Sequence, residues 1–478
     1  MQKLPALRGQ VLLHALILAS IAMLFIAGMA TWAISNLKVT QKTLNRALAL
    51  EIAEAGIDYY RWHLAHSPQD FKDGTGNPGP YLHTFSDKSG NVIGHYALAI
   101  TPPPNGSTRV TITSTGFVVA DADISKSIKV TLGIPSLAKY AIAANADMRF
   151  GAGTEVFGPI HSNGGIRFDG IAHNIVTSAK DKYTDPDTPF DIAFGVHTHI
   201  SPADPSPPAA VPTHSDVFQA GRQFPVPQID FTGITSDLAK IKADAQANGR
   251  YFASSGFLGY HIIVKTNGTF DLYKVKTLAS LPSGCDNSAG QTGWGSWSIK
   301  SGATSQTLAG NYALPANGLI FAEDHIWVDG QINTARLTIA SGRFPDDPST
   351  RTNIMINDNL LYTNYDGKDV IALIAQGNIT AGLTSQDVLR VDAALVAQNG
   401  RAGRYYYKSS KCTPYDVRQS ITLYGALITN QRYGFAYVGG TGYQTRNITY
   451  DGNLLYSPPP SFPLTSDQYS TLSWQEVK

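Results

Sequence analysis

The stretch GQVLLHALILASIAMLFIAGMATWAISNL, residues 9–37, contains no Asp, Glu, Lys or Arg. Its apolar part, residues 11–34, is long enough to cross the roughly 30 Å hydrocarbon layer of a bilayer as one helix. A helix of this length in a soluble protein normally keeps a polar face, but only His14, Ser20 and Thr31 interrupt the apolar residues here. The stretch therefore predicts a membrane-spanning helix near the N-terminus.

The helical pattern continues beyond the apolar stretch and becomes amphipathic. Apolar residues recur there at spacings of three and four, the period of one face of an α-helix. This stripe consists of Leu44, Leu48, Ile52, Ala55, Tyr59 and Trp62. Pro68 is expected to stop the helix just after His66. One helix is therefore predicted over residues 10–66.

Three kinds of N-terminal segment share this composition. A cleaved secretory signal needs a small-x-small site after the apolar run, but the nearest one, at residues 28–30, lies inside the run. A plain signal anchor needs nothing beyond the apolar helix. A prepilin leader is a short basic segment ending in Gly directly before the helix, and residues 1–9, with Lys3, Arg8 and Gly9, fit this description.

Residues 8–66 resemble the N-terminal region of PilX-type minor pilins and related pseudopilins. The pattern A-x-x-A-E-A-G-I is typical of that family, and residues 53–57 match it, whereas Leu50 replaces its first Ala. The resemblance implies that a prepilin peptidase cuts between Gly9 and Gln10 and that the new N-terminus is methylated. It also implies a helix that packs into a filament core and carries a globular domain outside the membrane, in the bacterial cell envelope.

His14 departs from the family pattern. Most major pilins have Glu at the fifth position of the mature chain, and some minor, tip-type members lack it. The resemblance therefore implies a tip or priming role more than a place along the shaft. An ionisable residue within a membrane helix is a candidate for a functional contact. The alternative is a lone polar residue near the cytoplasmic end of the helix.

The body of the chain is predicted to be mainly β. Three segments within residues 67–135 alternate apolar and polar residues, which indicates a small antiparallel β unit that packs on the striped helix. From residue 136 to 457, short apolar runs are separated by Asn, Asp and Gly corners, which favours the stacked rungs of a parallel β-helix, or solenoid. The irregular spacing leaves a β-sandwich as the alternative. A loop-rich insertion is expected over residues 177–313 and an extended tail over residues 458–478.

Composition argues against several classes of function. The net charge is +1 and no basic block is interleaved with aromatic residues, so nucleic-acid binding is not expected. The sequence has no P-loop, dinucleotide-binding or G-x-S-x-G motif, and no cofactor is expected. Cys285 and Cys412 are not in a C-x-x-C pair, which argues against a cysteine metal site. They either form one disulfide in an oxidising compartment or remain separate thiols.

Two groups of residues have the chemistry of metal ligands. Asp181, Asp185, Asp187 and Asp191 lie close together in the sequence, but their spacing is not that of an EF-hand, and a solvated loop is favoured over a Ca²⁺ site. His197 and His199 alternate on an expected strand, which places both on one face. Because no established metal motif is present, no metal site is predicted.

Two other groups bear on a sugar-related function. Glycoside hydrolases use paired carboxylates, and the candidates in the expected solenoid are Glu155, Asp169, Glu323, Asp324 and Asp329. Residues 405–407 are three consecutive tyrosines, which fit either a sugar-binding or partner-binding surface or a loop with partly buried rings, and the loop is favoured.

Together these patterns favour a non-catalytic, minor pilin-like protein that acts in pilus assembly or adhesion. The expected partners are the membrane, other pilin-like subunits, the prepilin peptidase, and surface glycans or proteins. The alternatives are a membrane-tethered carbohydrate-active β-helix enzyme and a plain signal-anchored surface protein.

Overall fold

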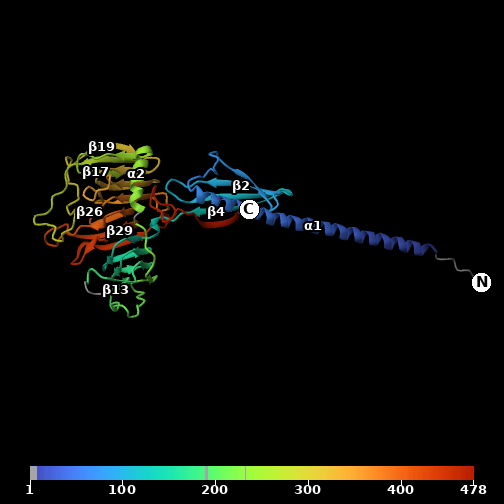
Figure 1. Cartoon of the computed structure of the whole chain (residues 1–478), viewed down its shortest axis with the longest axis horizontal. Helices are drawn as coiled ribbons and strands as arrows, with labels where there is room; N and C mark the ends of the chain where they lie inside the picture. Colours follow the sequence, from blue (N-terminus) through green and yellow to red (C-terminus); the bar gives the residue numbers. More distant parts are fainter. Residues whose placement is uncertain (1–7, 189–191, 232, 478) are drawn as a thin grey trace, which may run out of the picture. The chain divides into compact units, whose positions relative to one another are not determined.

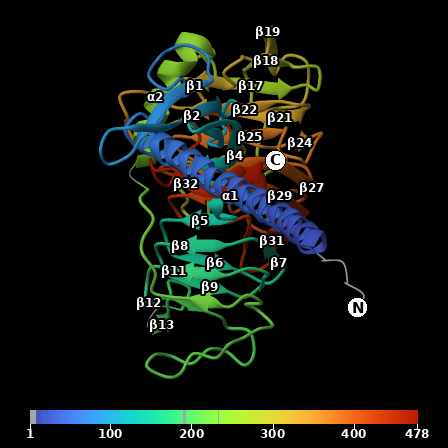
Figure 2. The ribbon, with the colours of Figure 1, turned by 90° about the vertical axis from the view of Figure 1, so that its right-hand side faces the viewer.

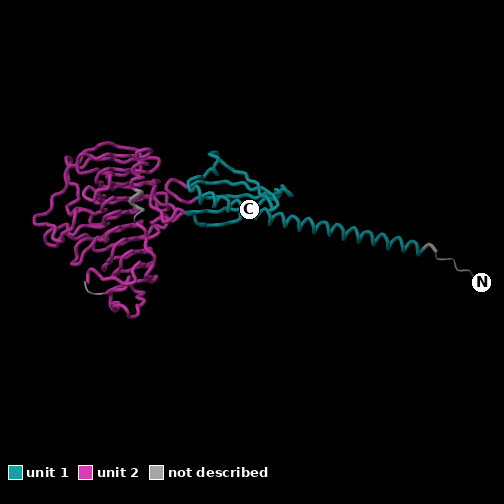
Figure 3. Tube along the Cα trace, in the orientation of Figure 1, with its two compact units in different colours: residues 1–102, 110–133, 468–478 teal, residues 103–109, 134–467 magenta. Residues whose placement is uncertain are grey.

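A computed structural model describes residues 8–188, 192–231 and 233–477 of the chain. Within this part of the chain, the fold divides into two compact units (Figure 3). The first unit consists of the residues up to Pro102, Val110–Gly133 and the residues from Gln468 onward. The second consists of Pro103–Arg109 and Ile134–Asp467.

The first unit begins with helix α1, Arg8–His66, which has 59 residues (Figure 1). Its N-terminal half is long and apolar enough to cross a membrane, and the side chains of that half are exposed. The predicted end at His66 is confirmed, and the backbone turns there into the loop that contains Pro68. The C-terminal half of α1 packs on strands β2, β3 and β4.

The buried face of α1 differs from the predicted stripe. Its buried residues include Ala49, Ile52, Ala53, Ile57, Tyr60 and Leu64. Leu44 and Trp62, at the two ends of the predicted stripe, are each 58% exposed. The predicted helical period is correct, but the buried face is displaced from the predicted stripe by about one residue. The buried face combines small residues with larger ones such as Tyr60 and Leu64.

The sheet of the first unit is antiparallel, as the sequence predicts, and its order is β1-β2-β3-β4-β32. The strands are β1 (Tyr81–Ser86), β2 (Val92–Thr101), β3 (Val110–Val118), β4 (Asp121–Gly133) and β32 (Ser470–Val477). The end of the chain therefore differs from the expected extended tail, because β32 pairs with β4 and completes the sheet.

The second unit is built from stacked parallel strands, which form three columns. The first column is β16 (Arg250–Phe252), β20 (Leu319–Ala322), β22 (Arg336–Ser341), β25 (Val370–Ala375), β27 (Val388–Ala397), β29 (Val417–Thr429), β5 (Ile142–Ala144), β8 (Ile160–Ser162), β11 (Val176–Ser178) and β15 (Arg222–Gln223). The second is β17 (Gly259–Val264), β21 (Ile326–Ile332), β24 (Leu360–Tyr362), β27, β29, β31 (Thr441–Tyr450), β7 (Thr154–Phe157) and β10 (Ile171–Ala172).

The third column has two parts. One part is β23 (Ile354–Met355), β26 (Ile379–Ala381) and β28 (Ala402–Arg404). The other is β6 (Met148–Phe150), β9 (Ile166–Phe168) and β14 (Val196–His197). The large parallel sheet that the sequence predicted is confirmed, and its parallel pairing argues against the β-sandwich alternative.

The chain enters this stack in the middle. Strand β5, the first rung, pairs in parallel with β29, one of the last rungs. The chain builds rungs in one direction as far as β15, then returns through helix α2 (Gly233–Asn248) and builds the remaining rungs from β16 back to β29. Figure 2 shows the strands stacked from β19 to β13.

Residues 177–313 are not purely a loop-rich insertion, because strands β15, β16 and β17 in this segment are rungs of the stack. An antiparallel pair, β18 (Thr269–Val275) and β19 (Gln306–Ala313), continues from β17 and covers that edge of the stack. A small hairpin of β12 (Lys182–Thr184) and β13 (Ile192–Phe194) lies before β14. Strand β30 (Ala436–Tyr437) pairs with β31.

The second unit has an apolar core between its columns and another outside the first column. The inner core is lined by residues such as Phe150, Phe168 and Leu395. Outside the first column, Leu238 and Ile241 of α2 pack against Phe321. The helix therefore covers a face of the sheet that would otherwise expose apolar side chains.

Candidate functional site

The predicted processing and contact residues lie together at the start of α1. Gly9 and Gln10 are in its first turn, and Nδ1 of His14 lies 2.6 Å from the backbone carbonyl oxygen of Gln10. His14 is exposed, as are the apolar residues that follow it. Most of the predicted leader, residues 1–7, lies outside the described residues.

Cys285 and Cys412 form a disulfide in the structure, across 127 residues of sequence. The bridge packs in an apolar cluster with Leu383, Tyr405 and Tyr407. The rings of Tyr405 and Tyr407 are thus buried, and Tyr406 is half-buried, which agrees with the loop interpretation of residues 405–407.

The five candidate carboxylates are each paired with a basic side chain. The pairs are Glu155 with His173, Asp169 with Arg167, Glu323 with Lys242, Asp324 with Arg343, and Asp329 with His261. A glycosidase needs one carboxyl group free to give a proton and another free to act as base or nucleophile. In this structure each of the five carboxylates is instead engaged by a neighbouring side chain.

A cleft of about 590 Å³, which the sequence did not reveal, lies in the second unit. Its lining includes the four arginines Arg149, Arg401, Arg432 and Arg446, with Asp187 as the acidic residue among the described lining residues. Arg432 and Arg446 lie close in the sequence, but Arg149 and Arg401 come from distant segments, so no single local charge pattern signals the cluster. Such a cluster makes the cleft suitable for an anionic ligand.

The arginines of the cleft have different roles. Arg446 is buried and donates to the backbone carbonyls of Tyr443, Gln444 and Ala152, so it holds the wall of the cleft. Arg401 donates to the hydroxyl of Tyr437. Arg432 and Arg149 both pair with Asp187.

Asp187 remains ionised between these two arginines. Burial alone would raise the pKa of Asp187, but the hydrogen bonds and charges of Arg432 and Arg149 outweigh it and lower the pKa. The side chain of Arg432 is still 38% exposed, so it remains available to a ligand.

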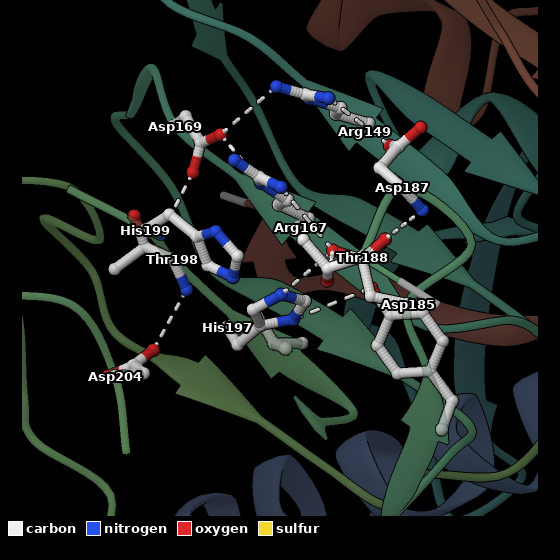
Figure 4. A network of polar contacts seen from close by, with 12 residues as sticks. Arg149, Arg167, Asp169, Asp185, Asp187, Thr188, His197, Thr198, His199 and Asp204 are labelled. Atoms are coloured by element: carbon white, nitrogen blue, oxygen red, sulfur yellow. Dashed lines mark hydrogen bonds and ion pairs between the residues drawn. The ribbon is translucent and has the colours of Figure 1, made fainter. Parts of the chain in front are cut away.

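A second polar cluster adjoins the cleft through Arg149 and Asp187 (Figure 4). Arg149, Arg167 and His197 occupy matching positions on strands β6, β9 and β14. Nε of Arg167 donates to Oδ2 of Asp169 over 2.8 Å. The parallel register of the three strands therefore stacks two arginines and a histidine in one row.

The structure brings His197 and His199 close to Asp185. Nε2 of His197 lies 3.5 Å from Oδ2 of Asp185, and the two imidazole rings are 5.2 Å apart. His197 is buried and His199 is exposed. Burial lowers the pKa of His197, partly opposed by the charge of Asp185, so the ring is neutral at pH 7.

The predicted aspartate cluster does not act as one group. Asp185 is buried, Asp187 lines the cleft, and Asp181 is exposed. Asp191 lies outside the described residues. The sequence therefore pointed to the right segment but did not show that Asp185 pairs with His197 and lies close to His199.

Comparisons with known proteins do not identify a family for this chain. No protein-family model matches the chain, and no curated protein matches it. Among solved structures, the chain is similar to the competence-associated pilin ComZ from Thermus thermophilus, at 14% sequence identity. The alignment covers 91% of this chain and 97% of that chain with a TM-score of 0.29, which does not establish a shared fold.

Proposed function

We propose that this chain is a pilin-like surface protein anchored by α1, with its β-rich body outside the membrane. The observation that carries the proposal is the contrast between the two halves of this helix. The C-terminal half is packed on an antiparallel sheet, whereas the N-terminal half exposes a continuous apolar surface. Such a surface requires either a bilayer or other apolar helices around it.

The proposal includes processing at the Gly9–Gln10 bond by a prepilin peptidase. Cleavage there would make Gln10 the first residue and His14 the fifth residue of the mature chain. A histidine at this position does not offer the permanent negative charge that would pair with a neighbour's amino terminus. This supports a tip or priming position in a filament rather than a place along the shaft.

Replacing Gly9 with Ala tests the processing step. Coexpression with a prepilin peptidase should convert the wild-type chain to a shorter form, and Gly9→Ala should remain full length on electrophoresis. Gly28→Ala is the matched control, because a Cβ atom at Gly28 meets nothing within 4 Å. Equal processing of Gly9→Ala and wild type would leave a plain signal anchor as the function of α1.

We further propose that the body binds acidic surface glycans through the arginine cleft, without catalysis. The support is the cluster of four arginines around one aspartate in a cleft of about 590 Å³. A polyuronate oligomer presents carboxylates that arginine binds in a bidentate manner.

Replacing Arg432 with Gln tests the adhesion proposal. Arg432→Gln should weaken the binding of an oligogalacturonate about tenfold, measured by titration calorimetry on the detergent-solubilised chain. Arg109→Gln, at an exposed position outside the cleft, should leave the affinity unchanged. Equal binding by wild type and Arg432→Gln, or equal binding of a neutral oligosaccharide, would contradict the proposal.

A further inference from the structure

We propose that Asp185, His197 and His199 form a binding site for one Zn²⁺ ion. One possible ligand atom from each of the three side chains lies within 4.8 Å of the other two. Two imidazole nitrogens and one carboxylate oxygen are a donor set that zinc binds, whereas Ca²⁺ and Mg²⁺ prefer oxygen ligands alone. None of these three side chains lines the arginine cleft, which the cluster adjoins through Arg149 and Asp187.

The buried Nε2 atom of His197 supports a cation at this position. Its side chain is only 3% exposed, and among the described residues its Nε2 atom has no hydrogen-bond partner. Buried side-chain nitrogens nearly always have such a partner, so an unpartnered one needs an explanation. The Nε2 atom faces Asp185, whose side chain is 2% exposed, and a cation between them would give this nitrogen a partner.

The surrounding chain holds the ligands in place. His197 is fixed by the pairing of β14 with β9, and its Nδ1 lies 3.4 Å from the hydroxyl of Tyr183. Such a contact on the second ring nitrogen orients a metal-binding histidine. Oδ1 of Asp185 accepts from the backbone N–H of Asp187, and Oδ2, which faces the histidine, also accepts from the hydroxyl of Thr188 over 3.2 Å.

The segment that carries His199 is also fixed at its backbone. The N–H of Thr198 donates to Asp204, and the N–H of His199 donates to Asp169. Figure 4 shows the contact with Asp169 above this segment and the contact with Asp204 below it. The backbone is thus anchored while the exposed His199 side chain is free to rotate.

Small movements convert this arrangement into a zinc site. Zinc bonds of about 2.0–2.2 Å in a tetrahedral site place the ligand atoms about 3.3 Å apart. The 3.5 Å separation of His197 and Asp185 is already close to this value. His199 needs only a side-chain rotation to approach, and the fourth position then remains open to solvent on its side.

The positive charge of Arg167 repels a bound cation, but neighbouring carboxylates reduce this repulsion. Its NH1 lies 3.5 Å from Oδ2 of Asp185, but its Nε also pairs with Asp169 at 2.8 Å. Its positive charge is therefore shared between two carboxylates.

Zinc titration of the chelator-treated, detergent-solubilised chain tests the site. The protein used for the titration should carry no polyhistidine tag, because a tag would bind zinc itself. Wild type should bind one equivalent of Zn²⁺, and His199→Ala and Asp185→Asn should each weaken this binding at least tenfold. His199 is exposed, and Asn preserves the hydrogen-bond acceptor at Asp185, so both variants should fold, which circular dichroism checks.

His173→Ala is the matched control, because His173 lies in the same unit and is paired with Glu155. It should bind zinc as wild type does. Zinc should also raise the melting temperature of wild type and of His173→Ala but not of His199→Ala. Wild-type affinity no higher than that of His199→Ala and Asp185→Asn, or equal loss in His173→Ala, would overturn the proposal.

Discussion

Protonation of the His325 side chain lowers the stability of the second unit. Burial lowers the pKa of His325 to about 4, and the backbone N–H of Asn353 donates to its Nδ1 atom over 3.0 Å. Nδ1 accepts this bond only when it carries no proton. Protonation of the folded state therefore costs both the hydrogen bond and the solvation of the charge.

The sign of the resulting pH dependence follows from the two pKa values. In the unfolded chain the pKa of His325 is about 6.5, so below this pH the unfolded state binds a proton that the folded state refuses. Stability contributed by neutral His325 is complete above about pH 6.5 and is lost as the pH falls toward 4. The loss between pH 7 and pH 5 is about 1–2 kcal/mol.

His325→Gln should reduce this acid sensitivity, because the amide oxygen accepts a hydrogen bond but does not titrate. The melting temperature of the variant should fall less than that of wild type between pH 7 and pH 5. His66→Gln, at the exposed end of α1, should behave as wild type. An unchanged pH dependence in His325→Gln would show that other groups control the acid response.

The contact between α1 and its sheet is made possible by small residues on both elements. A Cβ atom at Gly116 of β3 would lie 2.1 Å from the backbone carbonyl oxygen of Ala49, and one at Gly56 would lie 2.3 Å from Oγ of Ser114. Ala53 continues the same narrow face of the helix. Helix and strand are therefore closer together than larger side chains would permit.

Gly116→Ala should destabilise the first unit by about 1–3 kcal/mol, because the new methyl group meets backbone that has no free space to move into. Thermal unfolding of the purified chain measures the change. Gly151→Ala, where a Cβ atom meets nothing within 4 Å, is the control and should have little effect. Equal melting temperatures for Gly116→Ala and wild type would contradict the close packing described here.

The contact between α1 and its sheet also shows which features of a helix a sequence pattern can predict. Spacings of three and four predicted the helix, because they depend only on the helical period, and Pro68 predicted its end at His66. They placed the face wrongly, because the pattern gives weight to large residues such as Leu44 and Trp62. The face that packs on the sheet instead includes Ala49, Ile52 and Tyr60.

At the scale of the whole molecule, the chain enters its parallel stack in the middle. Local patterns of short apolar runs and Asn or Gly corners predicted the rungs, because each run is a complete strand. They did not predict that β5 pairs with β29, because strand patterns carry no information about which distant strand is the neighbour. The same limit hid β15, β16 and β17 within a segment that appeared loop-rich in sequence.

The candidate site was predictable only in part, for a related reason. His197 and His199 were noticed because they lie two residues apart, and the hairpin then brings Asp185 to them. The arginine cleft gathers Arg149, Arg401, Arg432 and Arg446 from separate rungs. A net charge of +1 over 478 residues gives no sign of such a local concentration.

The central claim is that α1 is the processed anchor of a pilin-like protein. Intact-mass and N-terminal peptide spectrometry of the chain extracted from its native membrane tests this claim most directly. We expect a mature chain that begins at Gln10 with a methylated amino group. A chain that begins at Met1 would contradict it and would leave α1 as a simple membrane anchor.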